Sequence, residues 1–205
     1  MGYAGAMTPG RPVEKISHAD PEKAQIASTL ASAFQDDPAL AWIIRSEQMR
    51  RKQLPRFFSI MAEQSHTHGT VLASPERHAA ALLYPSGVIR DDNLWTSLRL
   101  LSIFKTSLPR GLKVADAMHK RHPDPQPYTY LRYVGVAPSA QGKGWGGAMV
   151  RAVIASAAVE GQGVLLEIAT PSNVAIYTRL GFETVSEWEV PAGGPKFWTM
   201  VHPAP

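Results

Sequence analysis

One short segment of the 205-residue chain concentrates glycine at the end of an apolar run. It reads Gly142-Lys143-Gly144-Trp145-Gly146-Gly147, and apolar residues recur after it at helical spacing. Glycine lets a backbone approach a ligand closely, and the first N–H groups of a helix have no partner within the helix. We therefore interpret the segment as an anion-binding loop, and the ligand we expect it to bind is a pyrophosphate group.

Two familiar phosphate-binding patterns fit this segment poorly. A Walker A loop needs Ser or Thr after its Gly-Lys pair to hold magnesium, whereas Gly144 and then Trp145 follow the Gly-Lys pair here. The dinucleotide fingerprint is formally present in the glycines, and Glu167 lies about twenty residues further on. However, residues 137–141 separate the glycines from the strand, and fewer than about 60 residues remain for the rest of a doubly wound domain.

A third pattern fits best. The run Val-Ala-Pro (136–138) followed by Gln-Gly-Lys-Gly-Trp-Gly (141–146) resembles the acetyl-CoA signature of the GNAT acetyltransferase superfamily, Q/R-x-x-G-x-G/A. The similarity continues through Leu-Glu-Ile-Ala-Thr-Pro-Ser-Asn (166–173) and Tyr-Thr-Arg-Leu-Gly-Phe (177–182). It is strong over residues 128–202, and it most resembles the puromycin N-acetyltransferase-like branch, including segments 33–39 and 190–195.

The resemblance implies an α/β, layered GNAT fold: a central mixed, mostly antiparallel sheet with helices on both faces. It also implies acetyl-CoA as co-substrate, no metal, and transfer of the acetyl group to a primary amine of a small molecule. Because the chain contains no cysteine to carry a covalent acyl group, we expect the amine to attack directly. The alternative is a CoA-binding regulatory or interaction module whose catalysis has degenerated.

The family pattern places the cofactor contacts on one strand edge, the loop after it and one later residue. These expected cofactor-binding residues are Val134, Gly135, Val136, Gln141, Gly142, Lys143, Gly144, Trp145, Gly146, Gly147 and Asn173. Asn173 and Tyr177 are four residues apart and share a helix face. The resemblance gives Tyr177 the role of general acid toward the leaving thiolate. By spacing alone, a tyrosine beside Leu180 could equally be a core residue.

The general base is a separate question, because the expected strand 128–136 has no carboxylate where many relatives carry a glutamate. Glu167 is the candidate. It lies in an apolar strand, where a carboxylate is costly unless it is paired or functional, and burial would raise its pKa. The structural alternative is that Glu167 simply pairs with Arg132 or Tyr130 on the neighbouring strand.

The elements that must position these residues follow from periodicity and caps. Asp20, Asp37 and Ser46 are expected helix caps, and Gly69 ends the third helix. Residues 91–122 are expected to be helical with a break at 109–111. The other expected helices are 144–158 and 173–180, and the expected strands are 13–17, 70–73, 79–84, 128–136, 164–169, 182–190 and 196–202. We expect a flexible tail over 1–12 and one domain over 13–205.

Composition narrows the function classes. With 21 Lys and Arg against 17 Asp and Glu, both scattered, the chain is not expected to bind nucleic acid. It has no apolar run of membrane-spanning length and no leading signal segment, so we expect no membrane partner and a cytoplasmic location. The closely spaced histidine pairs (66 and 68, 119 and 122) are not expected to hold a metal. The expected oligomeric state is a monomer or a homodimer.

Overall fold

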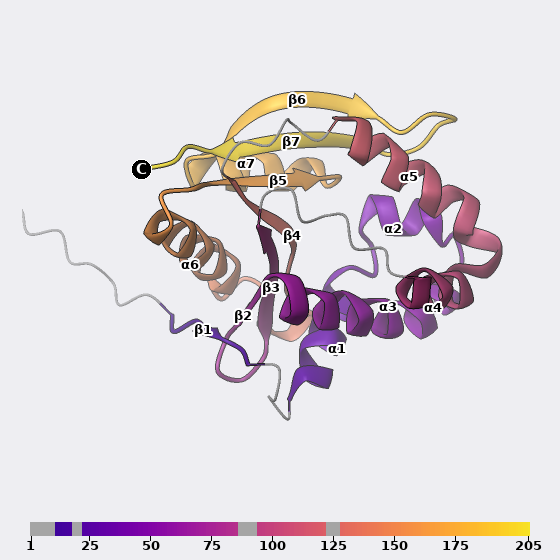
Figure 1. Cartoon of the computed structure of the whole chain (residues 1–205), viewed down its shortest axis with the longest axis horizontal. Helices are drawn as coiled ribbons and strands as arrows, with labels where there is room; N and C mark the ends of the chain where they lie inside the picture. The colour runs from indigo at the N-terminus through magenta and orange to yellow at the C-terminus, as the bar shows by residue number, and fades with distance from the viewer. Residues whose placement is uncertain (1–10, 18–21, 86–93, 122–127) are drawn as a thin grey trace, which may run out of the picture.

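A computed structural model of the chain describes residues 11–17, 22–85, 94–121 and 128–205. Within these residues, seven strands form one sheet in the order β1-β2-β3-β4-β5-β7-β6 (Figure 1). Only the β4–β5 pair is parallel, and every other neighbouring pair is antiparallel. The strands are β1 (Glu14–Lys15), β2 (Thr70–Ala73), β3 (Ala79–Pro85), β4 (Tyr128–Val136), β5 (Gly163–Ile168), β6 (Glu183–Glu189) and β7 (Lys196–His202).

Helices cover both faces of this sheet, as expected from the sequence. Their bounds are α1 (Lys23–Ala33), α2 (Pro38–Ile43), α3 (Glu47–His68), α4 (Leu94–Phe104), α5 (Leu108–Arg121), α6 (Trp145–Val159) and α7 (Pro171–Arg179). One apolar core lies between the sheet and helices α6 and α7. A second core lies on the other face of the sheet, under the five helices α1, α2, α3, α4 and α5 (Figure 1). We call the sheet face that packs against α6 and α7 the α6 face, and the opposite sheet face the α1 face. None of the described helices is long and apolar enough to cross a bilayer.

Local sequence signals explain most of the helix boundaries. The Asp37 carboxylate accepts hydrogen bonds from two N–H groups at the start of α2, and Ser46 caps α3 in the same manner. The expected cap at Asp20 lies outside the described residues. The expected break at 109–111 is wrong: the chain turns at Lys105, which has φ 45°, and Pro109 sits in the first turn of α5, where its missing N–H costs nothing.

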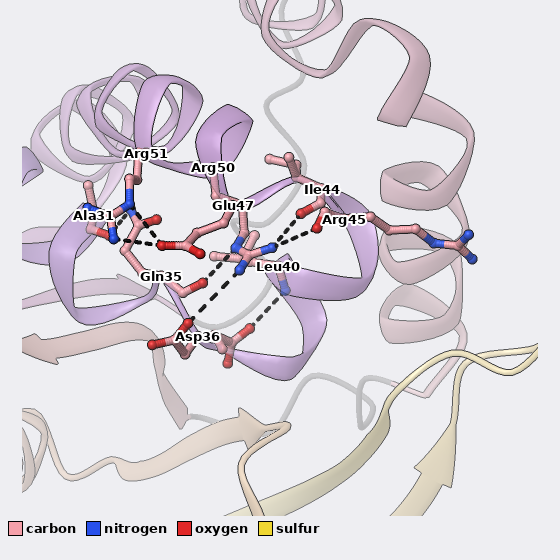
Figure 2. A network of polar contacts seen from close by, with 10 residues as sticks. Ala31, Gln35, Asp36, Leu40, Ile44, Arg45, Glu47, Arg50 and Arg51 are labelled. Carbon is pink, nitrogen blue, oxygen red and sulfur yellow. Dashed lines mark hydrogen bonds and ion pairs between the residues drawn. The ribbon is translucent and has the colours of Figure 1, made fainter.

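Arg50 of α3 ties together the first three helices on the α1 face. Its guanidinium, which is buried, donates from Nε to the Gln35 carbonyl at 2.7 Å and from Nη1 to the Ile44 carbonyl at 2.9 Å. Figure 2 shows these bonds converging on Arg50 from the turns on either side of α2. The cation thus satisfies one carbonyl in the turn before α2 and another in the turn after it, and it links both turns to α3.

Candidate active site

The parallel strands β4 and β5 separate in the middle of the sheet. Their pairing runs from Tyr128 and Gly163 to Leu131 and Leu166 and ends there. Beyond that point β4 stays paired with β3 as far as Val136, and β5 stays paired with β7 as far as Ile168. The edge of β4 toward β5, which includes the predicted residues Val134, Gly135 and Val136, therefore has backbone groups free to bind an extended ligand.

A β-bulge lies at the same level. Leu83 of β3 pairs with Leu131, and its neighbour Leu82 pairs with Tyr133, so Arg132 is the extra residue on β4. Leu131 and Val134 consequently both pack on the α6 face, while Tyr133 packs on the α1 face. The Arg132 guanidinium lies 5.6 Å from the ring centre of Tyr133. No pattern in the sequence predicted this bulge.

The glycine segment connects the end of β4 to the start of α6 through the short 3-10 helix η2 (Pro138–Ala140). Gly142 and Gly144 have φ of 72° and 83°, values that favour glycine, and Gly144 is the residue before α6. None of the N–H groups of residues 142–147 donates to a backbone carbonyl within the described part of the chain. A side chain at Gly142 would meet nothing within 4 Å. A run of backbone donors without backbone acceptors at a helix start suits a pyrophosphate.

Three cationic side chains surround this loop. Lys143 donates from Nζ to the Ser139 carbonyl at 2.8 Å, so the side chain folds back over the loop. Arg11 donates from Nε to the Lys143 carbonyl at 2.7 Å and lies over the Trp145 ring at 4.7 Å. The Arg151 guanidinium lies beside Gly147, 3.2 Å from the point that a Cβ would occupy there. Together they make the mouth of the anion-binding loop electropositive.

Arg11 is the contact that the sequence did not predict. It belongs to the segment that was expected to be a flexible tail, and residues 1–10 of that segment lie outside the described residues. Arg11 and Lys143 are 132 positions apart, so no local pattern connects them. The side chain is exposed, which leaves its remaining donors available to a ligand held by the loop.

Asn173 and Tyr177 lie on α7, directly after β5. The Tyr177 ring is buried in the α6-face core that also holds Trp145, Leu131 and Val134, and it contacts Phe182 edge-on. Burial raises the pKa of its phenol well above the ordinary value. Tyr177 is thus a residue of the α6-face core. The Asn173 side chain is half-buried and makes no hydrogen bond within the described residues.

Glu167 lies one residue past the last β4–β5 pair and points to the α1 face. Its Oε2 accepts a hydrogen bond from the Tyr130 hydroxyl at 3.0 Å, while its Oε1 is buried without a hydrogen-bond partner in the described residues. Burial raises the pKa of Glu167 to about 7, although the Tyr130 hydrogen bond and the nearby Arg132 charge both act to lower it. The expected pairing with Tyr130 is therefore present, and one carboxylate oxygen is left over.

The two residues predicted to transfer protons lie on opposite faces of the sheet. Tyr177 belongs to the core of the α6 face, whereas Glu167, on the α1 face, lies one residue past the last β4–β5 pair. A proton acceptor and a proton donor on opposite sides of a gap can serve a reaction in which one group gains a proton and another loses one. Among the described residues, no three His, Asp or Glu side chains are arranged to hold a metal ion.

Comparisons with known proteins agree with this geometry. A family model described as an acetyltransferase (GNAT) domain matches residues 112–184, a range that contains every predicted site residue. A structure titled histone acetyltransferase HPA2 and related acetyltransferase, from Corynebacterium glutamicum, is 25% identical; the match covers 96% of this chain and 97% of that one, with a TM-score of 0.71. The predicted GNAT fold is confirmed.

More distant structures share the fold alone. Arylalkylamine N-acetyltransferase 2 from Aedes aegypti is 15% identical, with a TM-score of 0.53 and coverage of 93% of this chain and 98% of that one. A chain of the NatC complex bound to Gag peptide and CoA is 11% identical, with a TM-score of 0.53 and coverage of 95% and 98%.

Proposed function

We propose that this chain, an acyltransferase with a GNAT acetyltransferase domain, transfers the acetyl group of acetyl-CoA directly to a primary amine of a small molecule. The observation that carries the proposal is the separation of β4 and β5, which leaves an open strand edge between the glycine loop and Glu167. Similarity to the puromycin N-acetyltransferase-like branch in sequence, and in fold to an arylalkylamine N-acetyltransferase, supports a small amine as acceptor.

Different residues at this gap would bind different parts of the cofactor. The N–H groups of residues 142–147 and the three cations around them would hold the pyrophosphate of the cofactor. The free edge at Val134, Gly135 and Val136 would bind the extended arm that follows, with the Asn173 amide beside it. Acetyl-CoA itself supplies an activated thioester, and a backbone N–H of this edge would polarise its carbonyl oxygen.

Glu167 and Tyr177 would move the protons. A carboxyl with a pKa of about 7 is half ionised at neutral pH and accepts a proton from an ammonium ion or from the attacking amine efficiently. Its Oε1 is the oxygen available for this, directly or through a water molecule. Burial keeps the Tyr177 hydroxyl protonated, and the same surroundings raise the proton affinity of a thiolate held beside it, so the phenol can protonate the leaving group.

The proposal is tested by thiol release from acetyl-CoA in the presence of a panel of primary amines. We expect at least one amine to stimulate release, with acetylated amine as the product, and we expect both Glu167→Gln and Tyr177→Phe to lower kcat by about 10²-fold or more. Tyr128→Phe is the matched control, because Tyr128 lies on β4 next to Gly163 at the start of the paired segment.

Two outcomes would contradict this function. If the chain binds CoA and no amine stimulates thiol release, the regulatory-module alternative is favoured. If release occurs and Tyr177→Phe retains the full rate, then Tyr177 is only a core residue and another group protonates the thiolate.

A further inference from the structure

We propose that Tyr130 is a positioning residue for this reaction: its hydroxyl holds Oε2 of Glu167 and so leaves Oε1 as the oxygen that accepts the proton. The inference rests on the proposed function, since it assigns a partner to the base of that reaction. It concerns a side chain that the sequence suggested only as a structural partner of Glu167.

Tyr130 is held rigidly from both sides. It pairs with Leu165 of β5 and with Tyr84 of β3, just before the point where β4 and β5 separate. Its ring is only 4% exposed and forms a small core with the same two residues. A hydroxyl on such a support has little freedom, which is the requirement for a group that orients another one.

Glu167, by contrast, lies beyond the last β4–β5 pair, so β4 does not fix its backbone directly. A carboxylate has two equivalent oxygens, and a single donor distinguishes them. The 3.0 Å bond from Tyr130 occupies Oε2, and the buried Oε1 has no partner among the described residues. An unpaired buried oxygen is costly, so a reactant or a water molecule that hydrogen-bonds to Oε1 would be stabilised there.

Among the described residues, no side chain other than Tyr130 donates a hydrogen bond to Glu167. On β4, Arg132 contributes a positive charge that stabilises the ionised carboxylate. On β7, Thr199 pairs with Glu167 in the sheet, and its hydroxyl accepts a hydrogen bond from Trp188 Nε1 at 3.0 Å and donates none to Glu167 among the described residues. From α5, the Arg121 guanidinium lies over the Trp188 ring at 5.2 Å. Tyr130 therefore remains the donor that orients the carboxylate.

The first test is an NMR titration of the full chain labelled at its glutamate carboxyl carbons, with the Glu167 signal assigned by its loss in Glu167→Gln. In Tyr130→Phe, which keeps the ring and its packing, we expect the titration midpoint of Glu167 to rise by about one pH unit. Tyr84→Phe is the matched control, because the hydroxyl of Tyr84 donates to the Met61 carbonyl and not to Glu167. Its midpoint should equal that of the wild type.

The second test is the pH dependence of kcat/KM for an amine that the wild type acetylates. A midpoint one unit higher predicts that Tyr130→Phe is about fivefold slower than the wild type near pH 7 and close to it near pH 9. A residue that only supports the fold would lower the rate equally at every pH.

The outcomes separate this inference from the function on which it rests. Acetyl transfer with an unmoved midpoint and an unmoved pH profile in Tyr130→Phe overturns the inference and leaves the function standing. Absence of acetyl transfer to any amine overturns the function, and with it the catalytic part of this inference, whatever the titration shows.

Discussion

Replacing Glu167 with glutamine should make the protein more stable at alkaline pH and less active. The side chain is largely buried on the α1 face, where its Oε1 has no partner among the described residues. Glutamine has the same shape and never ionises, so the variant removes the cost of burying a charge and keeps most of the packing. A residue retained at the expense of stability is typical of a functional site.

The magnitude follows from the pKa of Glu167, which is raised from 4.5 to about 7 in the folded chain. The folded state therefore favours the protonated carboxyl. The stability that this group contributes is fully present below pH 4.5 and is lost as the pH rises through 7. At about 1.4 kcal/mol for each pKa unit, the wild type loses about 3 kcal/mol that Glu167→Gln does not lose.

Urea unfolding followed by tryptophan fluorescence, at a series of pH values between about 4 and 9, measures this difference. We expect the free energy of unfolding of Glu167→Gln, relative to the wild type, to increase by about 3 kcal/mol across the series. Glu160→Gln, at an exposed position after α6, is the control and should show no such trend. A difference that stays constant with pH would refute the raised pKa and with it the reasoning on the base.

Three further predictions concern the cofactor side of the site. Gly142→Ala and Gly161→Ala both place a side chain at positive φ in open space, so each should lower the free energy of unfolding by about 1–2 kcal/mol. Calorimetry should find weaker CoA binding only in Gly142→Ala, because Gly161 lies outside the glycine loop. Arg11→Gln should raise the Kd for CoA about 3- to 10-fold and should weaken the dependence of that Kd on salt concentration. Lys15→Gln on β1 is the control and should leave the Kd unchanged. Equal effects of the two substitutions would exclude a role for Arg11. In Gly135→Ala the new methyl would lie 2.9 Å from a side-chain carbon of α1, so thermal unfolding should show a loss of about 1–3 kcal/mol, and an unchanged midpoint would contradict this close packing.

The sequence predicted those parts of the fold that depend on local signals. The bounds of β4 and β7 agree with the expected strands, and the caps at Asp37 and Ser46 are in place. Apolar periodicity and capping residues act over a few positions, so they are visible in the sequence itself. The misplaced helix break shows the limit, because proline in the first turn of a helix and proline that ends one look alike.

The sequence allowed us to predict which residues belong to the candidate site, but not how their side chains contact one another. Residue spacing placed Glu167 in an apolar strand, but it could not decide between a carboxylate that is paired and one that takes part in catalysis. In the structure one oxygen is paired with Tyr130, and the other has no partner among the described residues. The bulge at Arg132 and the contact of Arg11 with the glycine loop depend on partners far along the chain. Such contacts are set by tertiary packing, and no window of sequence contains them.

Calorimetric titration of the unaltered chain with coenzyme A tests the central claim most directly, with NAD and ATP as comparison ligands. The loop at residues 142–147, next to an open strand edge, predicts saturable heat with one coenzyme A per chain and none with the other two. Heat with NAD or ATP and none with coenzyme A would contradict the account.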